Sequence, residues 1–217
     1  MTNIILVRHG QSAANLVHRF AGHSHFPLTE LGVAQAVKTA EYITGKYKID
    51  KLYSSDLLRA FNTACPISER LGMCPIITDT GLRELHAGKW EGHVWEELFR
   101  LFPEQTQVWN HKINECCIDG GETVVEMAER SRRAIFRIAE ENDGKTVAIT
   151  SHATVVRSFE TFARFGNLDR MSEIDWPTNA SVSIYVYYGG KIIADSYSVD
   201  EHLGELKQNI IMESGRK

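Results

Sequence analysis

The sequence predicts an α/β fold: a three-layer α/β/α sandwich with a mostly parallel central sheet, helices on both faces and a small helical cap insertion. Short apolar, mainly β-branched runs alternate with helix-like stretches, and two of the runs lead into similar strand-to-helix turns, at His9 and His152. A Gly189-Gly190 turn between two later runs adds an antiparallel hairpin. We expect a single domain over residues 1–217, with the cap at about residues 85–119.

Three strands are expected in the first half of the chain, at residues 3–7, 52–54 and 76–77, because each is a short apolar run followed by polar or turn-forming residues. In a parallel sheet with helices on both faces, ligands bind outside the carboxyl ends of the strands. The residues that directly follow each run are therefore the first candidates for chemistry.

Two helices connect these strands. The first begins around Thr29 and ends near Gly45, and the second begins at Asp56 and stops at Gly72. The apolar residues at helical spacing that we expect to face the core are Leu31, Ala34, Val37 (or Lys38 in its place) and Ile43 in the first helix, and Leu58, Phe61, Cys65 and Leu71 in the second.

The second half of the chain contains one long helix that begins at Thr123 and ends at Asp143-Gly144. The residues expected on its inner face are Val124, Met127, Ala128, Ser131, Ile135 and Ile138. The remaining elements are a strand at 146–151, a helix at about 154–165, and hairpin strands at 181–188 and 191–199.

Composition and charge exclude several classes of protein. Hydrophobic residues make up 43% and charged residues 24% of the chain, which is typical of a globular protein. The net charge of −4 lacks the basic footprint of a nucleic-acid binder, and no apolar run approaches the ~20 residues of a membrane span. We therefore expect no nucleic-acid or membrane partner. The N-terminus has no basic segment of the kind that precedes a signal sequence, so we expect a cytoplasmic protein.

The four cysteines, Cys65, Cys74, Cys116 and Cys117, show neither paired zinc-site spacing nor the density of a disulfide scaffold. We expect them to be reduced. The vicinal pair Cys116-Cys117 could form a redox couple, but two semi-buried thiols in a connecting segment are the simpler interpretation.

Five side chains near the carboxyl ends of the strands form a set suited to a phosphoryl group. They are Arg8, His9, Arg59, Glu84 and His152. Several strong donors can bind the phosphoryl oxygens together, and Arg59 lies near the positive start of a helix. One imidazole would attack phosphorus, a carboxyl group would protonate the leaving oxygen, and the arginines would neutralise charge. These considerations do not decide which histidine attacks.

The nine histidines include no HExxH pair, and the chain has no Walker P-loop, so neither a standard zinc hydrolase site nor a nucleotide cradle is indicated. We therefore expect no cofactor and no metal ion. His18, His23 and His25 could form a metal clip or contact substrate, but a solvated histidine-rich loop is the favoured interpretation.

Seven sequence blocks carry a resemblance to a known family. In chain order they are Leu6 to Asn15 (LVRHGQSAAN), Pro27 to Ala36, Ser54 to Ala64, Leu82 to Glu84, Gly88 to Gly92, Gly120 to Glu122, and Ser151 to Arg157. Together they resemble the signature of the histidine phosphatase superfamily, also called the phosphoglycerate mutase-like proteins. The resemblance covers nearly the whole chain. It departs from the usual pattern at Gln11, where the family often has Glu, and at Ala153, where it usually has Gly.

The resemblance implies a role for each candidate site residue. His9 would be the phosphorylated nucleophile and Glu84 the general acid and base. The remaining residues that it implies are Arg8, Arg59 and His152 as ligands of the phosphoryl group, Ser12 and Asn15 as assisting groups, and Ala21 and Gly22 as backbone lining of the entrance.

Three functions are weighed against one another. The first is a metal-independent phosphomonoesterase that hydrolyses small phosphorylated metabolites through phosphohistidine. The second is a cofactor-dependent phosphoglycerate mutase, and the third is a phosphate-binding module without chemistry. The run from Leu85 to Gly92 resembles the phosphatase branch, and the core residues of the site are all present, so we favour the first function.

The substrate is expected to depend on the cap and on the loop at residues 18–26. Phosphorylated sugars, phosphoglycerates, phosphoserine and phosphorylated ribazole are the candidates within the family. The oligomeric state stays open, with a homodimer among the alternatives. Trp90, Trp95 and Trp109 could stack on an aromatic substrate, but packing of the cap is the preferred explanation for them.

Overall fold

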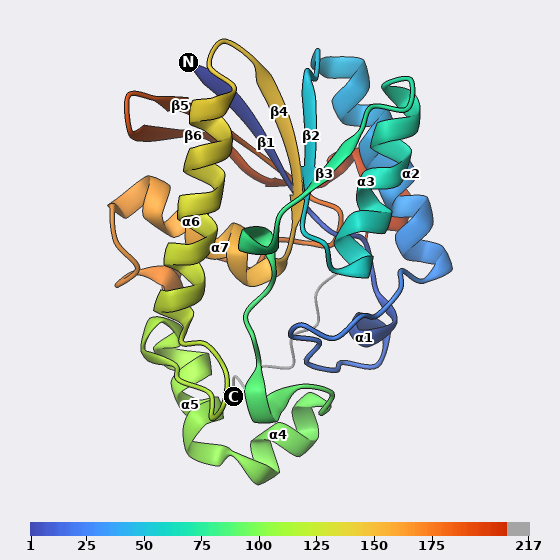
Figure 1. The fold of residues 1–217 in the computed structure, drawn as a ribbon. Helices are drawn as coiled ribbons and strands as arrows, with labels where there is room; N and C mark the ends of the chain where they lie inside the picture. Colours follow the sequence, from blue (N-terminus) through green and yellow to red (C-terminus); the bar gives the residue numbers. More distant parts are fainter. Residues whose placement is uncertain (208–217) are drawn as a thin grey trace.

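The computed structural model describes residues 1–207, which contain a six-stranded mixed sheet (Figure 1). Its strands are β1 (Thr2–Arg8), β2 (Lys51–Ser54), β3 (Ile76–Thr78), β4 (Thr146–Ser151), β5 (Val182–Tyr188) and β6 (Lys191–Val199). Their spatial order is β3-β2-β4-β1-β5-β6. The first four in this order are parallel, and β5 and β6 run antiparallel to their neighbours. The predicted sheet and C-terminal hairpin are thus confirmed.

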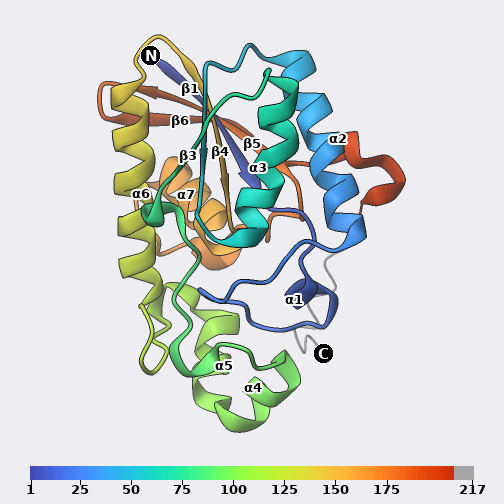
Figure 2. The same ribbon diagram turned by 45° about the vertical axis from the view of Figure 1, so that its right-hand side comes forward.

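Helices cover both faces of this sheet. The helices are α1 (Ala13–Leu16), α2 (Glu30–Lys46), α3 (Leu58–Arg70), α4 (Trp95–Leu101), α5 (Pro103–His111), α6 (Val124–Glu141) and α7 (Ala153–Phe165). Five 3-10 turns accompany them: η1 (Thr80–Leu82), η2 (Gly88–Trp90), η3 (Ile113–Glu115), η4 (Met171–Glu173) and η5 (Glu201–Leu206). Helices α2 and α3 lie against one face and α6 and α7 against the other (Figures 1 and 2). The three-layer fold class is therefore confirmed.

Strand β1 shows why the sheet is buried on both sides. Ile4 and Leu6 belong to the core under α6 and α7, whereas Ile5 and Val7 belong to the core under α2 and α3. All four side chains are at most 1% exposed. Since successive side chains of a strand point to opposite faces, a continuous apolar run is what a doubly covered central strand requires.

The expected inner faces of α2 and α3 are wrong at most positions. Ile43 is buried as expected, but Val37 and Leu58 are 40% and 38% exposed. Lys38 is exposed too, and Leu31, Ala34, Phe61 and Cys65 are only partly buried, whereas the partly buried Leu71 packs against the core under α2 and α3 as expected. The residues that do face inward are Gly32, Gln35, Ala36, Thr39, Ala40 and Ile43 in α2, and Arg59, Ala60, Thr63, Ala64, Ile67 and Ser68 in α3.

Small residues explain this difference, because Ala36, Ala40 and Ala60 let the two helices and the sheet approach closely. The polar residues of the inner face are satisfied: Thr39, for example, donates a 2.8 Å hydrogen bond to a backbone carbonyl. Helix α3 also begins at Leu58 and not at Asp56, whose carboxylate instead forms an ion pair with Arg83.

Helix α6 matches its prediction closely. Thr123 caps its N-terminus through a hydrogen bond from the backbone N–H of Glu126, 3.1 Å long, and the capping box is complete. Every residue that was expected on its inner face is buried. Strand β4 likewise has the bounds that its apolar run predicts.

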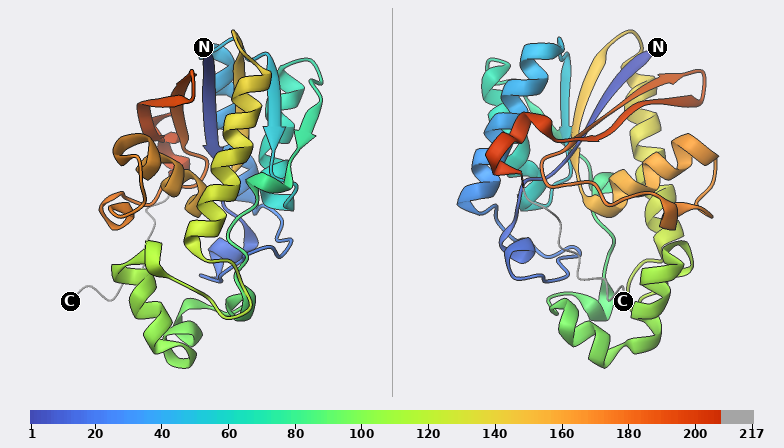
Figure 3. Two further views of the ribbon diagram at one scale, coloured as in Figure 1. Left: turned by 60° about the vertical axis from the view of Figure 1, so that its left-hand side comes forward. Right: turned by 180° about the vertical axis from the view of Figure 1, so that it is seen from behind.

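Residues 85–119 lie beyond the carboxyl ends of the parallel strands, at the same end of the sheet as α1 (Figures 1 and 3). This segment contains α4 and α5. Trp90 is fully buried and Trp109 is 4% exposed, and their ring centroids are 5.8 Å apart. Phe20 contacts both rings, at 5.6 and 5.3 Å between centroids. The buried tryptophans therefore pack this segment, as expected.

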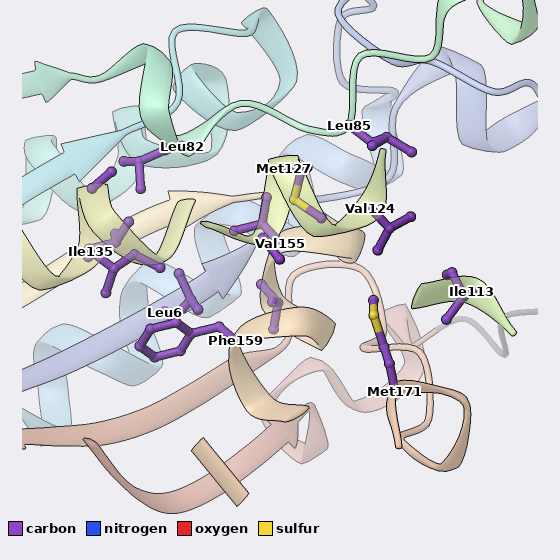
Figure 4. Close-up of a cluster of buried hydrophobic side chains, with 14 of the residues drawn as sticks. Leu6, Leu82, Leu85, Ile113, Val124, Met127, Ile135, Val155, Phe159 and Met171 are labelled. Atoms are coloured by element: carbon purple, nitrogen blue, oxygen red, sulfur yellow. The ribbon is translucent and has the colours of Figure 1, made fainter. Parts of the chain in front are cut away.

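The core continues from the sheet into this segment without a break. Figure 4 shows Leu6 of β1, Met127 of α6 and Val155 of α7 with Leu85 and Ile113, which come from residues 85–119. All five belong to one buried cluster.

No helix among residues 1–207 is both long and apolar enough to span a membrane. All four cysteines are free thiols, with Cys116 buried and Cys117 exposed.

Candidate active site

Parallel pairing of β1 with β4 brings the two predicted histidines together. Arg8, the last residue of β1, is in register with Ser151, the last residue of β4. His9 and His152 follow these two residues, and the backbone N–H of His9 donates to the carbonyl of Ser151, 3.0 Å away. The two imidazole rings meet edge to face with centroids 5.3 Å apart.

Hydrogen bonds fix the tautomer of His9. Its Nδ1 lies 2.7 Å from the carbonyl oxygen of Gly10, which can only accept, so Nδ1 carries the proton. Its Nε2 lies 3.2 Å from Nε of Arg59, which can only donate, so Nε2 presents a lone pair. This assignment follows from the hydrogen-bond network. Nε2 is therefore the ring atom that can attack phosphorus, through its lone pair.

Arg59 is held by the loop that precedes α2. Its Nη1 donates to the carbonyl of Ser24 and its Nη2 to the carbonyl of Gly22, each at 2.9 Å. Gly22 has a φ of +47°, and a Cβ at this position would lie 2.4 Å from the carboxylate of Glu91. Ala21 accepts a backbone hydrogen bond from Ser24 within the same loop. The backbone of Ala21 and Gly22 thus lies beside the guanidinium that contacts His9.

Two nitrogen atoms of the site are left unpaired. Arg8 donates from Nη1 to the carbonyl of Pro177, and His152 places Nε2 2.8 Å from Oγ of Ser55. Within residues 1–207, however, Arg8 Nε and His152 Nδ1 are buried with no hydrogen-bond partner. Because buried polar atoms are nearly always paired in folded proteins, these two nitrogens are candidates for contact with a bound ligand.

Glu84 is 9% exposed and follows η1, so it does not come directly after a strand as its sequence position suggested. Its Oε1 accepts from the backbone N–H of Leu85 at 2.8 Å. Its Oε2 accepts from the backbone N–H of Thr154 at 3.2 Å, in the first turn of α7. The helix that follows His152 therefore also holds the carboxylate of Glu84.

Ser12 and Asn15 form the N-terminal cap of the short helix α1. Oγ of Ser12 donates to Oδ1 of Asn15 at 3.0 Å. Oδ1 of Asn15 also accepts from Nδ2 of Asn179 at 3.2 Å. Asn179 also donates to the carbonyl of His9, at 3.2 Å. The hydroxyl of Ser12 is therefore used inside the protein, where it orients Asn15.

Burial and the two arginines hold the histidines neutral. Burial lowers the pKa of His9 well below its ordinary value of 6.5, and the charges of Arg59 and Arg8 lower it further. Burial, Arg59 and His9 lower the pKa of His152 in the same way. Burial also lowers the pKa of each of these arginines to about 10, a shift that Glu84 partly offsets. The two cations outnumber the single carboxylate of Glu84 in this buried site, and the excess of positive charge favours the binding of an anion.

We expect the free energy of unfolding to decrease as the pH is lowered from 6.5 toward 5. His9 and His152 have pKa values below 6.5 in the folded protein, so the unfolded chain binds more protons in this range. Their contribution to stability is complete above pH 6.5 and is lost as the pH falls. These two groups contribute a slope of up to about 2.7 kcal/mol per pH unit, and His23 and His202, whose pKa values burial also lowers, add to it. Urea unfolding between pH 5 and 7.5 measures it.

His152→Gln removes one of these two groups and serves as the comparison. We expect the pH slope of this variant to be smaller than that of the unaltered protein by up to about 1.4 kcal/mol per pH unit, the contribution of one such group. An equal slope in both proteins would contradict the assignment of a neutral, buried His152.

Two of the three loop histidines, His18 and His25, are exposed, as expected of a solvated loop, and Nδ1 of His25 accepts from the backbone N–H of Leu58 at 3.4 Å. His23 differs from the expectation, because it is partly buried and its Nε2–H donates to the carbonyl of Glu84 at 2.8 Å. In the part of the chain that the structure describes, no three His, Cys, Asp or Glu side chains are grouped to hold a metal ion.

Three contacts of the site were not expected from the sequence. Ser55 lies inside a block that resembles the family signature, so its position gave a usable signal. Thr154 acts through its backbone N–H, and Asn179 comes from a turn that matches no motif. Neither of these two could be identified from residue type and spacing.

Comparisons with known proteins agree with this geometry. The family described as "Histidine phosphatase superfamily (branch 1)" matches residues 4–200. Two relatives from Arabidopsis thaliana are a metal-independent phosphoserine phosphatase, 33% identical over 95% of this chain and 85% of its own length, and phosphoglycerate mutase-like protein 4, 31% identical over 86% of this chain and 80% of its own length. A solved structure of mycobacterial glucosyl-3-phosphoglycerate phosphatase in complex with VO3 has a TM-score of 0.84 and 27% identity, and covers 91% of this chain and 99% of its own.

Proposed function

Since the chain belongs to the histidine phosphatase superfamily and is a phosphomonoester hydrolase of small phosphorylated metabolites, we propose that it works through a phosphohistidine on His9. The observation that carries this proposal is the tautomer of His9: its proton is held on Nδ1 by Gly10, and the lone pair of Nε2 faces the guanidinium of Arg59. Because the pKa of His9 is low, Nε2 is not protonated at neutral pH.

In the first step, Nε2 of His9 attacks phosphorus and the bond from phosphorus to the ester oxygen breaks. Glu84 gives its proton to that oxygen, so the product leaves as an alcohol. Arg8, Arg59 and His152 bind the phosphoryl oxygens through N–H donors, and the positive charge of the two arginines stabilises the negative charge of the transition state. The unpaired Arg8 Nε and His152 Nδ1 support this assignment.

In the second step, the carboxylate of Glu84 takes a proton from water, the water oxygen attacks phosphorus, and the bond from phosphorus to Nε2 of His9 breaks. Inorganic phosphate leaves, and Glu84 is protonated again for the next cycle. The backbone N–H groups of Leu85 and Thr154 hold the carboxylate in one orientation through both steps.

The remaining site residues are proposed to select the substrate. Asn15 would contact the phosphate through its amide, with Ser12 orienting it, and the backbone of Ala21 and Gly22 would line the entrance. Residues 85–119 would act as a cap inserted in a single domain.

The names of the phosphoserine and glucosyl-3-phosphoglycerate phosphatases favour a phosphorylated hydroxy acid as substrate. The cytoplasm stays the proposed compartment, in keeping with four free thiols.

A mutase is the second candidate, because one relative is described as phosphoglycerate mutase-like. In a mutase, the second hydroxyl of the substrate competes with water for the phosphohistidine. With 3-phosphoglycerate and its bisphosphate, we expect release of inorganic phosphate to exceed isomerisation. A coupled assay for 2-phosphoglycerate, run beside a phosphate assay, decides between them, and dominant formation of 2-phosphoglycerate would reverse the ranking.

The assay for released phosphate, with phosphoserine and the other candidate esters as substrates, is run with and without excess EDTA. We expect equal rates, since Arg8 and Arg59 already supply the positive charge that phosphoryl transfer needs. Loss of activity with EDTA and recovery on addition of zinc or magnesium would contradict the metal-independent mechanism.

A further inference from the structure

Glu122 and Arg130 have no part in the steps above, yet both side chains form hydrogen bonds with the backbone at or next to Glu84. We propose that Arg130, oriented by Glu122, is a positioning residue that fixes the backbone from which the carboxyl group of Glu84 projects. This inference rests on the proposed role of Glu84 as general acid and base.

The guanidinium of Arg130 forms hydrogen bonds with backbone carbonyls of the segment 80–84. Its Nη1 donates to the carbonyls of Gly81 at 2.8 Å and Arg83 at 3.1 Å, and lies 3.4 Å from that of Thr80. Its Nη2 donates to the carbonyl of Glu84 itself at 3.1 Å. One side chain from α6 thus holds the backbone before Glu84 and at Glu84.

Glu122 fixes the orientation of this guanidinium. Its Oε1 accepts from Nε of Arg130 at 2.7 Å and its Oε2 accepts from Nη2 at 2.8 Å. Each side chain is about one quarter exposed, at 23% for Arg130 and 24% for Glu122. With two N–H groups bonded to Glu122 and three to backbone carbonyls, all five donors of the guanidinium are used. A lysine has three donors and no planar fork, so it could not reproduce this arrangement.

Glu122 also holds the backbone after Glu84. Its Oε2 accepts from the backbone N–H of His86 at 3.0 Å, and its own backbone N–H donates to the carbonyl of His86 at 2.9 Å. A Cβ at Gly121 would lie 2.3 Å from the same carbonyl, so glycine is required for this close approach. Gly121 and Glu122 of this sequence block thereby gain a physical explanation.

The segment around Glu84 needs such support because residues 83–87, between η1 and η2, form no helix or strand. The carbonyl of Glu84 accepts from His23 at 2.8 Å as well as from Arg130, and the buried side chain of Leu85 packs into the core cluster of Figure 4. With its carbonyl and the neighbouring residue both held, the carboxyl group of Glu84 can reach only a narrow region of the site. Misplacement of a catalytic group by about 1 Å can lower a rate by about 10²-fold.

The experiment compares Arg130→Met with Arg137→Met. Arg137 also lies on α6 and forms an ion pair with Asp79, at the start of η1, but it is 52% exposed and bonds none of the carbonyls between Thr80 and Glu84. We expect Arg130→Met to lower kcat/KM for an alkyl phosphate by about 10- to 10²-fold. The nitrophenol burst rate with p-nitrophenyl phosphate should change less than about threefold, because its phenolate leaves without a proton. Arg137→Met should change neither rate by more than about twofold.

A second measurement is the effect of Arg130→Met in a Glu84→Gln background. If Arg130 acts through the carboxyl group, the double variant should be as active on alkyl phosphates as Glu84→Gln alone. An equal loss on both substrates, or losses that multiply in the double variant, would overturn the inference and show a general structural role. Glu122→Gln and Arg130→Lys, which are milder changes, should show the same substrate dependence and provide the test if Arg130→Met does not fold.

The two proposals fail in different ways. If Glu84→Gln itself loses equal activity on both substrates, then the acid role of Glu84 is wrong and the positioning role of Arg130 falls with it. If Glu84→Gln discriminates between the substrates and the variants of Arg130 and Glu122 do not, then only the positioning role is wrong.

Discussion

His9→Ala is expected to lower turnover by at least about 10⁴-fold on every phosphomonoester, because the reaction then lacks the atom that forms the bond to phosphorus. The other imidazole of the site, His152, lies beside Ser55 and is not placed against Arg59 by a hydrogen bond. Steady-state phosphate release measures the loss. His111→Ala, which removes an exposed histidine at the end of α5, is the matched control and should keep full activity.

Trapping of the intermediate identifies the nucleophile directly. Phosphohistidine is lost in acid and survives alkali, so the unaltered protein is mixed with substrate, quenched in alkali and digested. Mass spectrometry should find the phosphoryl group on the peptide that contains His9. A label on His152, or a His9→Ala variant that keeps its activity, would overturn the proposed mechanism.

Glu84→Gln is expected to lower the rate by about 10²- to 10⁴-fold for alkyl phosphates, whose leaving alkoxides need a proton. The glutamine side chain keeps the size of the group but cannot transfer a proton. With p-nitrophenyl phosphate the phenolate leaves unaided, so formation of the phosphohistidine should be slowed much less. Hydrolysis of that intermediate still needs a base and should be slow.

Stopped-flow measurements separate these two steps. Glu84→Gln should show a fast burst of nitrophenol followed by slow turnover. If the burst rate instead falls as much as the rate on alkyl phosphates, Glu84 acts in binding or in the fold, and another carboxylate must be the acid. Glu91 is the first to test, since its carboxylate accepts hydrogen bonds from the backbone of His23 and the hydroxyl of Ser24 in the loop beside Arg59.

The central strands were predictable because a continuous apolar run is what burial on both faces of the sheet requires. The run from Ile4 to Val7 is apolar on both faces, and it lies between two helical layers. The faces of α2 and α3 were not predictable from apolar periodicity, because the contact is made by alanines and by satisfied polar residues such as Thr39. Of the large apolar residues of these helices, Ile43 and Ile67 are buried, whereas Val33, Val37 and Leu58 remain at the surface.

The candidate site shows a similar division. His9 and His152 could be expected at one place because each follows a strand of the same parallel sheet, and strand register then brings their rings together. The contacts of Arg130 and Asn179 depend on how a distant helix and a distant turn meet the backbone at Glu84 and His9. Such contacts leave no periodic signal, because carbonyl oxygens are present at every residue.

If residues 85–119 set the substrate preference, as proposed above, the uninterrupted core between the sheet and this segment limits how that preference can change during evolution. Ile113 and Leu85 share one cluster with Met127 and Val124 of α6, so the two parts cannot be exchanged independently of each other. A segment transplanted from a relative with another preference would need the matching face of α6 to avoid cavities, and a lost buried side chain costs about 2 to 5 kcal/mol. On that proposal, new preferences are more accessible through single substitutions at exposed positions of residues 85–119 than through recombination of whole segments.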